Sequence, residues 1–226
     1  MKLQKETNAH GKWYDDACGT AFALELIGER WALLIIRELM FGGRRFSDLR
    51  GGLPSISAKV LTERLEGLER AGIVQRRQLP PPAAAQVYEL TKWGYGAEES
   101  IQALGRWAAC SPDHDPALPL SAASLMMSFR TMFDATRAAG MVLTGGIVVG
   151  AEQFLVAVDD RKLRAERGEP QLPEFVLAAP SAPPIAALVY GKLPADELAG
   201  TGLCVSGDAA AAARFIDLFH LPAKAH

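Results

Sequence analysis

The sequence has 226 residues and a mass of 24.3 kDa, which suffices for one large domain or two small ones. Hydrophobic residues make up 49% and charged residues 22%, an ordinary globular composition that excludes a disordered or fibrous chain. Apolar runs are too short for a membrane span, and the N-terminus lacks the apolar centre of a secretory signal. Three scattered cysteines exclude a disulfide framework and a zinc site. We expect a cytoplasmic protein without membrane association, metal or cofactor.

The net charge of −2 is unevenly distributed along the chain. Residues 1–110 carry 15 Lys and Arg against 13 Asp and Glu, whereas residues 111–226 carry 9 against 13. The window from Arg37 to Arg77 holds nine basic and five acidic residues. A local basic excess of this kind is typical of a nucleic-acid-binding surface.

A proline-rich segment divides the chain near its middle. Residues 110–119 contain three prolines and no periodicity, and proline cannot sustain a helix interior or a central strand. We therefore predict one domain over residues 1–110, a linker over 111–119 and a second domain over 120–226.

The first domain begins with helical patterns. Apolar residues recur at three-to-four spacing over 18–27 and 30–40, and a short third helix is expected from residue 44 to 49. After a glycine-proline turn, a fourth helix is predicted from Ala58 to Ala71. Ser55 or Ser57 supplies its N-cap, and Gly72 ends it.

Two short strands and a helix complete this domain. Residues 73–78 and 86–90 have strand character and are joined by a proline-alanine loop. Thr91 then caps an amphipathic helix that carries Ile101, Leu104 and Trp107. A hairpin beside a helix-turn-helix is a winged helix, an arrangement that binds DNA.

Four motifs follow one another in this domain: Cys18 with ALELIGERW at 23–31, RFSDL at 45–49, ISAKVLTERL at 56–65 and YELT at 88–91. Over residues about 15–108 they resemble the HxlR family of bacterial winged helix-turn-helix transcriptional regulators. The resemblance implies transcription regulation by a homodimer, whose two recognition helices enter successive major grooves of double-stranded DNA. It also implies that the N-terminal and last helices of the domain form the dimer interface.

The expected DNA-binding residues lie on the fourth helix and the first strand of the hairpin: Ser57, Lys59, Thr62, Arg64, Arg76 and Arg77. Arg64 has a second interpretation, an ion pair with Glu38 or Glu69. Arg76 and Arg77 alternate on a strand, so only one of them is expected to face a phosphate.

Cys18 also has two interpretations. It packs as a small apolar residue, or it is a redox switch, because a helix N-terminus stabilises a thiolate and some relatives of this family use a cysteine in this region. The neighbouring Asp15 and Asp16 are expected to oppose a lowered pKa. Cys204 is expected to be inert, since it falls in a predicted core strand.

The second half is predicted to be a small α+β domain, which makes the whole chain α+β. A helix is expected from Ser121 to Ala139, followed by strands at 141–149, 153–159, 175–178 and 203–206. Further helices are expected at 183–190 and 208–219. Helices should cover one face of the sheet, so that the other face needs the first domain, a partner chain or an apolar ligand.

The segments VYGKL at 189–193 and GLCVSGD at 202–208, with Arg214 and Phe215, resemble the sterol carrier protein domain. The resemblance implies a hydrophobic tunnel for an apolar small molecule. Its expected lining residues are Leu125, Phe129, Met132 and Phe133. The alternative is an ordinary core with a dimerisation surface.

No catalytic residues are predicted. The sequence has no H-E-x-x-H, G-x-S-x-G, Walker or dinucleotide-binding motif, so an enzyme is not expected. We predict an HxlR-type regulator that binds operator DNA as a homodimer and is modulated by an apolar ligand. The alternatives are a redox-sensing regulator with a structural second domain, a lipid carrier, and a scaffold that binds only protein.

Overall fold

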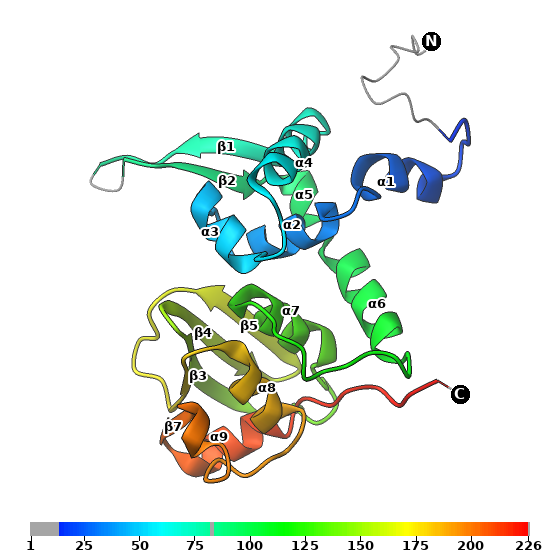
Figure 1. The fold of residues 1–226 in the computed structure, drawn as a ribbon. Helices are drawn as coiled ribbons and strands as arrows, with labels where there is room; N and C mark the ends of the chain where they lie inside the picture. Colours follow the sequence, from blue (N-terminus) through cyan, green and yellow to red (C-terminus); the bar gives the residue numbers. More distant parts are fainter. Residues whose placement is uncertain (1–13, 82–83, 226) are drawn as a thin grey trace.

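The computed structural model describes residues 14–81 and 84–225, which form two halves stacked one above the other (Figure 1). The first 13 residues of the predicted N-terminal domain and the tip of the hairpin lie outside the described residues. Helix α6 (Glu98–Ala109) and the segment 110–121 lead from one half to the other. Among the helices of the described ranges, none has the length and apolarity that a membrane span requires.

The N-terminal half is a winged helix, as predicted. Its elements before α6 are α1 (Gly19–Ile27), α2 (Ala32–Leu39), α3 (Phe46–Gly52), α4 (Ala58–Arg70), β1 (Val74–Gln78), β2 (Gln86–Leu90) and α5 (Lys92–Tyr95). One face of α2 and one face of α4 form its core. Their fully or almost fully buried side chains are Ile35, Ile36, Leu39, Leu61, Leu65 and Leu68.

The start of α4 is fixed by a side-chain cap. Ser57 Oγ accepts a hydrogen bond from the backbone amide of Val60 at 3.2 Å, which satisfies one of the orphan amides of the first turn. The helix ends before Gly72, whose φ of +70° is a left-handed conformation that glycine adopts at little cost. The predicted start of this helix is therefore confirmed, and its end at Arg70 falls one residue before the predicted Ala71.

The hairpin is attached to the helices by backbone pairing. Arg44, just before α3, exchanges two backbone hydrogen bonds of 2.8 Å with Tyr88 of β2. The single helix predicted after Thr91 is instead two, α5 and α6, because the chain turns at Gly96. Glycine costs about 1 kcal/mol relative to alanine inside a helix, which favours the interruption there.

The C-terminal half is built on a mixed five-stranded sheet. Its strands are β3 (Val142–Val149), β4 (Glu152–Asp159), β5 (Lys162–Arg167), β6 (Phe175–Ala179) and β7 (Cys204–Gly207). They are ordered β5-β4-β3-β6-β7, with β3 and β6 parallel and the other neighbours antiparallel. Strand β5 was not predicted.

Three helices pack on one face of this sheet: α7 (Ala122–Met132), α8 (Ala182–Val189) and α9 (Ala209–Ile216) (Figure 1). Alternate strand residues point into this layer, as expected for a half-buried sheet. The largest buried side chains here are five phenylalanines with no exposed surface: Phe129, Phe154, Phe175, Phe215 and Phe219.

The helix predicted from Ser121 to Ala139 was too long. It ends at Met132, because Phe133 has extended backbone angles and forms a bridge with Phe219. The carboxylate of Asp134 then accepts hydrogen bonds from the amides of Thr136 and Arg137, which stabilises a turn in place of further helix.

The opposite face of the sheet is partly covered by the chain itself, a solution that the sequence analysis did not include. The connection from β5 to β6 crosses this face over β4 and β3. Within it, Pro170 lies so close to Gly146 that a Cβ at Gly146 would collide with the proline ring. Side chains of this outer face, such as Leu155 and Val176, are half-buried.

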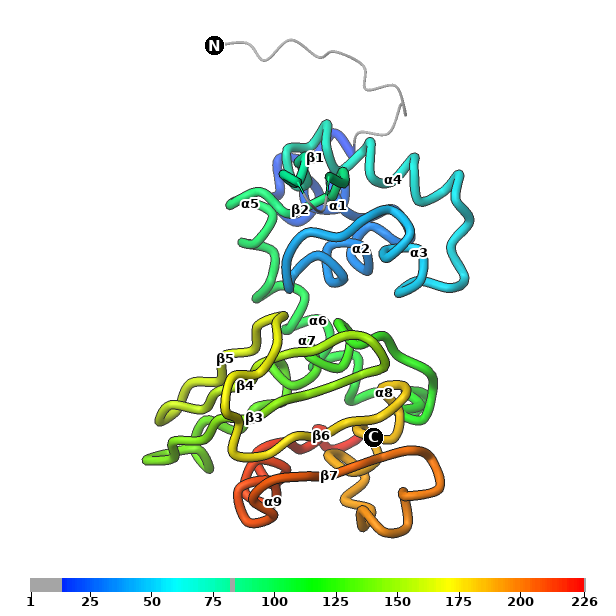
Figure 2. The backbone as a smooth tube through the Cα atoms, turned by 90° about the vertical axis from the view of Figure 1, so that its left-hand side faces the viewer, coloured from blue at the N-terminus to red at the C-terminus, as the bar shows by residue number. Residues whose placement is uncertain are grey.

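The two halves are joined by packing and by polar contacts. In Figure 2, α2 and α3 lie on the side of the winged helix that faces the C-terminal half. The ring of Phe41, which follows α2, packs edge-on against Phe154 at 5.7 Å. Beside it, Glu152 of β4 pairs with Arg44 at 2.7 Å and with Arg167. The winged helix is therefore in direct physical contact with the second sheet.

Candidate nucleic-acid interface

The first two turns of α4 present an exposed polar surface. Lys59 lies opposite the buried Leu61 and its side chain is 86% exposed, and Thr62 is exposed at the flank of the buried face. The nearest acidic partner of Lys59 is Glu63 at 4.0 Å, a separation at which an exposed pair holds little energy. The ammonium group is thus available to a ligand, and it lies at the positive end of the helix dipole.

Further along α4 the exposed face becomes acidic. Glu63 and Glu66 are both exposed, whereas the first turn holds no acidic residue. A phosphate backbone would be repelled by the later turns and attracted by the first. This asymmetry limits a DNA-facing surface to the N-terminal part of the helix.

Arg64 is held by the winged helix itself. Its guanidinium group donates to the Glu29 carboxylate at 2.9 Å and to the backbone carbonyl of Arg30 at 3.1 Å. The side chain ties α4 to the turn between α1 and α2. The structure thus gives Arg64 an ion pair, though with Glu29 and not with the predicted Glu38 or Glu69.

The two arginines of the wing are also paired within the chain. Arg76 contacts Glu69 at 2.8 Å and lies over the ring of Tyr88, and Arg77 contacts Glu89 at 2.6 Å. Both guanidinium groups remain near half exposed. These exposed pairs are weak, so either arginine can still reach a phosphate.

Two further arginines lie on this side of the winged helix and were not among the predicted DNA-binding residues. Arg45 precedes α3 and Arg50 lies in its last turn, and both are exposed. In a helix-turn-helix the first helix crosses the DNA backbone. Both lie in the basic window from Arg37 to Arg77, and this local excess of positive charge could have identified them from the sequence.

Helix α1 has an apolar composition and no buried residue. Phe22 and Leu24 are about half exposed, and on α6 Leu104 is similarly exposed while Trp107 is 75% exposed. Apolar groups of this size gain free energy when they are removed from water. The two helices that were predicted to form a dimer interface therefore both carry unburied apolar side chains.

Cys18 occupies the N-cap position of α1 and is exposed. The backbone amides of Thr20 and Ala21 stabilise the thiolate and lower the pKa of Cys18. Asp15 and Asp16 were expected to oppose a lowered pKa, but the pKa of Cys18 is lowered nevertheless. The prediction of a buried Cys204 is wrong: it is exposed on the edge strand β7, because its side chain points to the outer face of the sheet.

The four predicted ligand-lining residues do not surround one cavity. Leu125 and Phe129 are fully buried, and Phe129 packs against the rings of Phe215 and Phe219 at 5.9 and 4.7 Å. Met132 instead lines a cavity between the two halves, and Phe133 lines a shallow polar hollow beside β5.

The capped, exposed helix and its attached hairpin define a winged helix-turn-helix protein. Residues 26–115 match the HxlR-like helix-turn-helix family. The regulator YodB of Bacillus subtilis is 40% identical over 92 residues, which cover 40% of this chain and 82% of YodB. The chain belongs to this family of transcriptional regulators.

Solved structures of two relatives align with part of the chain. The reduced form of YodB from B. subtilis is 36% identical, covers 44% of this chain and 100% of its own, and has a TM-score of 0.40. The redox regulator HypR in its oxidized form is 30% identical, covers 43% of this chain and 100% of its own, and also has a TM-score of 0.40. The family match at 26–115 leaves most of the C-terminal half outside it.

Proposed function

We propose that the protein binds operator DNA as a homodimer and regulates transcription. The observation that carries this proposal is the first turn of α4, where Ser57 caps the helix and Lys59 and Thr62 are exposed beside it. A recognition helix contacts base edges through its N-terminal residues. Arg76 and Arg77 of the wing are the further candidate contacts, whereas Arg64, at the flank of α4, is assigned to the ion pair with Glu29.

The homodimer is supported by the unburied apolar side chains of α1 and α6. Helix α1 packs only Leu26 and Ile27, both partly buried, against the core, and most helical stability in proteins comes from packing. A second copy that presents the same two helices would cover Leu24 and Trp107 in an isologous interface.

Genomic fragments selected on the immobilised protein would identify candidate operators for a direct test. Fluorescence anisotropy of the enriched duplex should then show tight binding with a steep salt dependence, and a scrambled duplex should bind far more weakly. Equal affinity for both duplexes would contradict specific operator binding. A salt-independent affinity would favour a scaffold that binds only protein.

For the C-terminal half we propose that it binds an apolar ligand, as its resemblance to the sterol carrier domain implies, or alternatively that it contributes to dimerisation. A mixed sheet with helices on one face is compatible with that resemblance. The solid phenylalanine core around Phe129 argues against a tunnel through the middle of this half. An apolar ligand therefore requires another place in the molecule.

A redox-sensing regulator is the second candidate function. It is favoured by the exposed Cys18, whose pKa is lowered by the amides at the start of α1. One similar protein is described as a redox regulator. If DNA affinity falls on mild peroxide treatment in the parent protein and not in Cys18→Ser, the switch is supported; equal loss in both would exclude it.

A further inference from the structure

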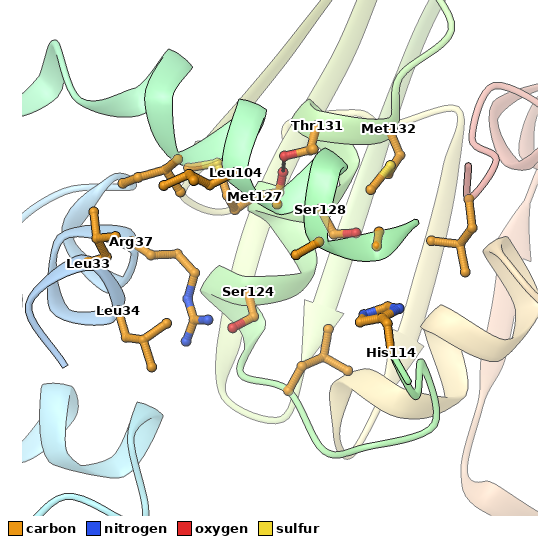
Figure 3. A pocket seen from close by; sticks show the side chains of 16 residues that line it. Leu33, Leu34, Arg37, Leu104, His114, Ser124, Met127, Ser128, Thr131 and Met132 are labelled. Atoms are coloured by element: carbon orange, nitrogen blue, oxygen red, sulfur yellow. Dashed lines mark hydrogen bonds between the residues drawn. The ribbon is translucent and has the colours of Figure 1, made fainter. Parts of the chain in front are cut away.

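A cavity of about 430 Å³ lies where the two halves meet (Figure 3). Leu33 of α2 and Leu104 of α6 form its wall on the winged-helix side, and Met127 and Met132 of α7 form its wall on the other side. Leu221, near the C-terminus, also lines it. Its volume falls within the range of roughly 300–1,000 Å³ that is typical of small-molecule sites.

Most of the lining is apolar and adaptable. Leucine and methionine side chains come from helices that are far apart in sequence, and methionine fits varied shapes because it is unbranched and polarizable. The hydroxyl groups of Ser128 and Thr131 are already used, by Tyr190 at 2.7 Å and by the Met127 carbonyl at 2.8 Å. The body of a suitable ligand is therefore apolar.

One charged side chain enters the cavity. Arg37 projects from α2 towards Ser124 (Figure 3), and its Nε and Nη2 both donate to the carboxylate of Glu38, at 3.3 and 2.9 Å. Glu38 is only 1% exposed, so this carboxylate balances the guanidinium charge inside the protein. Among residues 14–81 and 84–225, no acceptor contacts Nη1 of Arg37.

The charge balance between Arg37 and Glu38 determines which ligand charge the cavity favours. A carboxylate ligand would add a second negative charge beside Glu38, and burying an unbalanced charge is costly. A neutral acceptor, such as a carbonyl or ester oxygen, can take the remaining Arg37 donor at no such cost. The site therefore prefers an uncharged molecule.

We propose that this cavity binds an uncharged, mainly apolar small molecule with one hydrogen-bond acceptor placed on Arg37. The ligand contacts both halves, so its affinity depends on how α7 packs against α2 and α6. By linkage, a ligand that binds more tightly to one arrangement of these helices increases the fraction of molecules in that arrangement. The position of the winged helix relative to α7 changes with it. This regulatory consequence rests on the proposed DNA-binding function, whereas ligand binding does not.

Gly105 of α6 allows the cavity to be filled selectively. A Cβ at Gly105 would meet only Thr131 Cγ2, at 3.9 Å, so the neighbouring space is open to a side chain. Gly105→Leu places an isobutyl group in the cavity, and Gly105→Ala adds a single methyl group as the matched control. Either change should favour the helix, because glycine has a low helix propensity.

The test is a fluorescence titration of the full chain with Nile red, a neutral apolar dye that carries a carbonyl acceptor. The parent and Gly105→Ala should bind it saturably with similar affinity, and Gly105→Leu should bind it about tenfold more weakly without a lower melting temperature. Absence of saturable binding in the parent, or equal binding by Gly105→Leu, would overturn the site. Sedimentation velocity adds a check: if Gly105→Leu dissociates the dimer, a second copy occupies the cavity and the small-molecule proposal is wrong.

A second titration separates this site from the proposed function. Saturating Nile red should change the affinity for the enriched operator duplex several-fold in the parent and not in Gly105→Leu. Dye binding without any change in DNA affinity would contradict the coupling between the cavity and DNA binding. The cavity itself would still be supported as a ligand site. Dye binding by a protein that shows no DNA affinity at all would support the cavity and contradict the proposed DNA-binding function.

Discussion

Ser121 Oγ donates a hydrogen bond to the Glu38 carboxylate at 2.6 Å and so joins the N-cap of α7 to the last turn of α2. The same hydroxyl accepts from the backbone amide of Ser124 at 3.0 Å. One side chain thus caps a helix of the C-terminal half and satisfies a buried carboxylate of the winged helix. The boundary between the halves is therefore a specific contact as well as an apolar one.

Ser121→Ala should lower the free energy of unfolding by about 1–2 kcal/mol, because it removes an N-cap and one partner of a buried charge. Ser181 at the start of α8 provides a matched control, since its side chain makes no capping hydrogen bond. Ser181→Ala should therefore stay within about 0.5 kcal/mol of the parent. Urea denaturation measures both, and equal effects would contradict the special role of Ser121.

Lys59→Ala should weaken DNA binding and reduce the salt slope by about one, if its ammonium group contacts a phosphate. The protein should stay as stable as the parent, because Lys59 is exposed. Arg64→Ala should do the reverse, with a loss of about 1 kcal/mol in stability and an unchanged salt slope, because Arg64 ties α4 to Glu29. Fluorescence anisotropy at several salt concentrations distinguishes the two variants. An unchanged salt slope for Lys59→Ala would show that Lys59 does not contact a phosphate.

Trp107→Asp should weaken the dimer, raising its dissociation constant about 30-fold or more if Trp107 is an interface anchor worth ~2 kcal/mol. Leu172→Asp is the control, because Leu172 is 96% exposed and lies in the β5–β6 connection, away from α1 and α6. Sedimentation equilibrium gives both constants. A dimer that tolerates Trp107→Asp would place the interface elsewhere.

Local pattern predicted most of the winged helix. The spacing of Leu61, Leu65 and Leu68, with Ser57 before and Gly72 after, sets α4 because capping and burial act within a few residues. Strand β5 could not be recognised in this way. It is an edge strand whose inward positions hold Leu163, Ala165 and Arg167, so only two of them are apolar and its sequence is mostly polar.

The candidate sites depended more on contacts between distant segments. The partner of Arg64 is Glu29, 35 positions earlier in the chain, and no local pattern indicates that pair. On α7, Phe129 and Met132 are three residues apart and both apolar, yet one lies in the core and the other on the cavity. Apolar character predicts that a side chain avoids water, and packing alone decides which space it meets.

Acid should weaken the contact between the halves through Glu152. Burial alone would raise the pKa of this carboxyl, but hydrogen bonds from Arg44 and Arg167 outweigh burial and hold the pKa below its usual 4.5. The stabilisation is therefore complete above pH 4.5 and is lost as the pH falls through the lowered folded-state pKa. Denaturation curves at pH 7 and below 4.5 should show the stability difference between the parent and Glu152→Gln shrinking; a difference independent of pH would contradict this role.

Cys18 and Cys204 are both exposed, so accessibility alone predicts equal reactivity. The amides of Thr20 and Ala21 lower the pKa of Cys18, which increases its thiolate fraction near neutral pH. Iodoacetamide at pH 7 should therefore alkylate Cys18 several-fold faster than Cys204, as followed by peptide mass mapping. Equal rates at pH 7 would remove the chemical basis for a redox switch at Cys18.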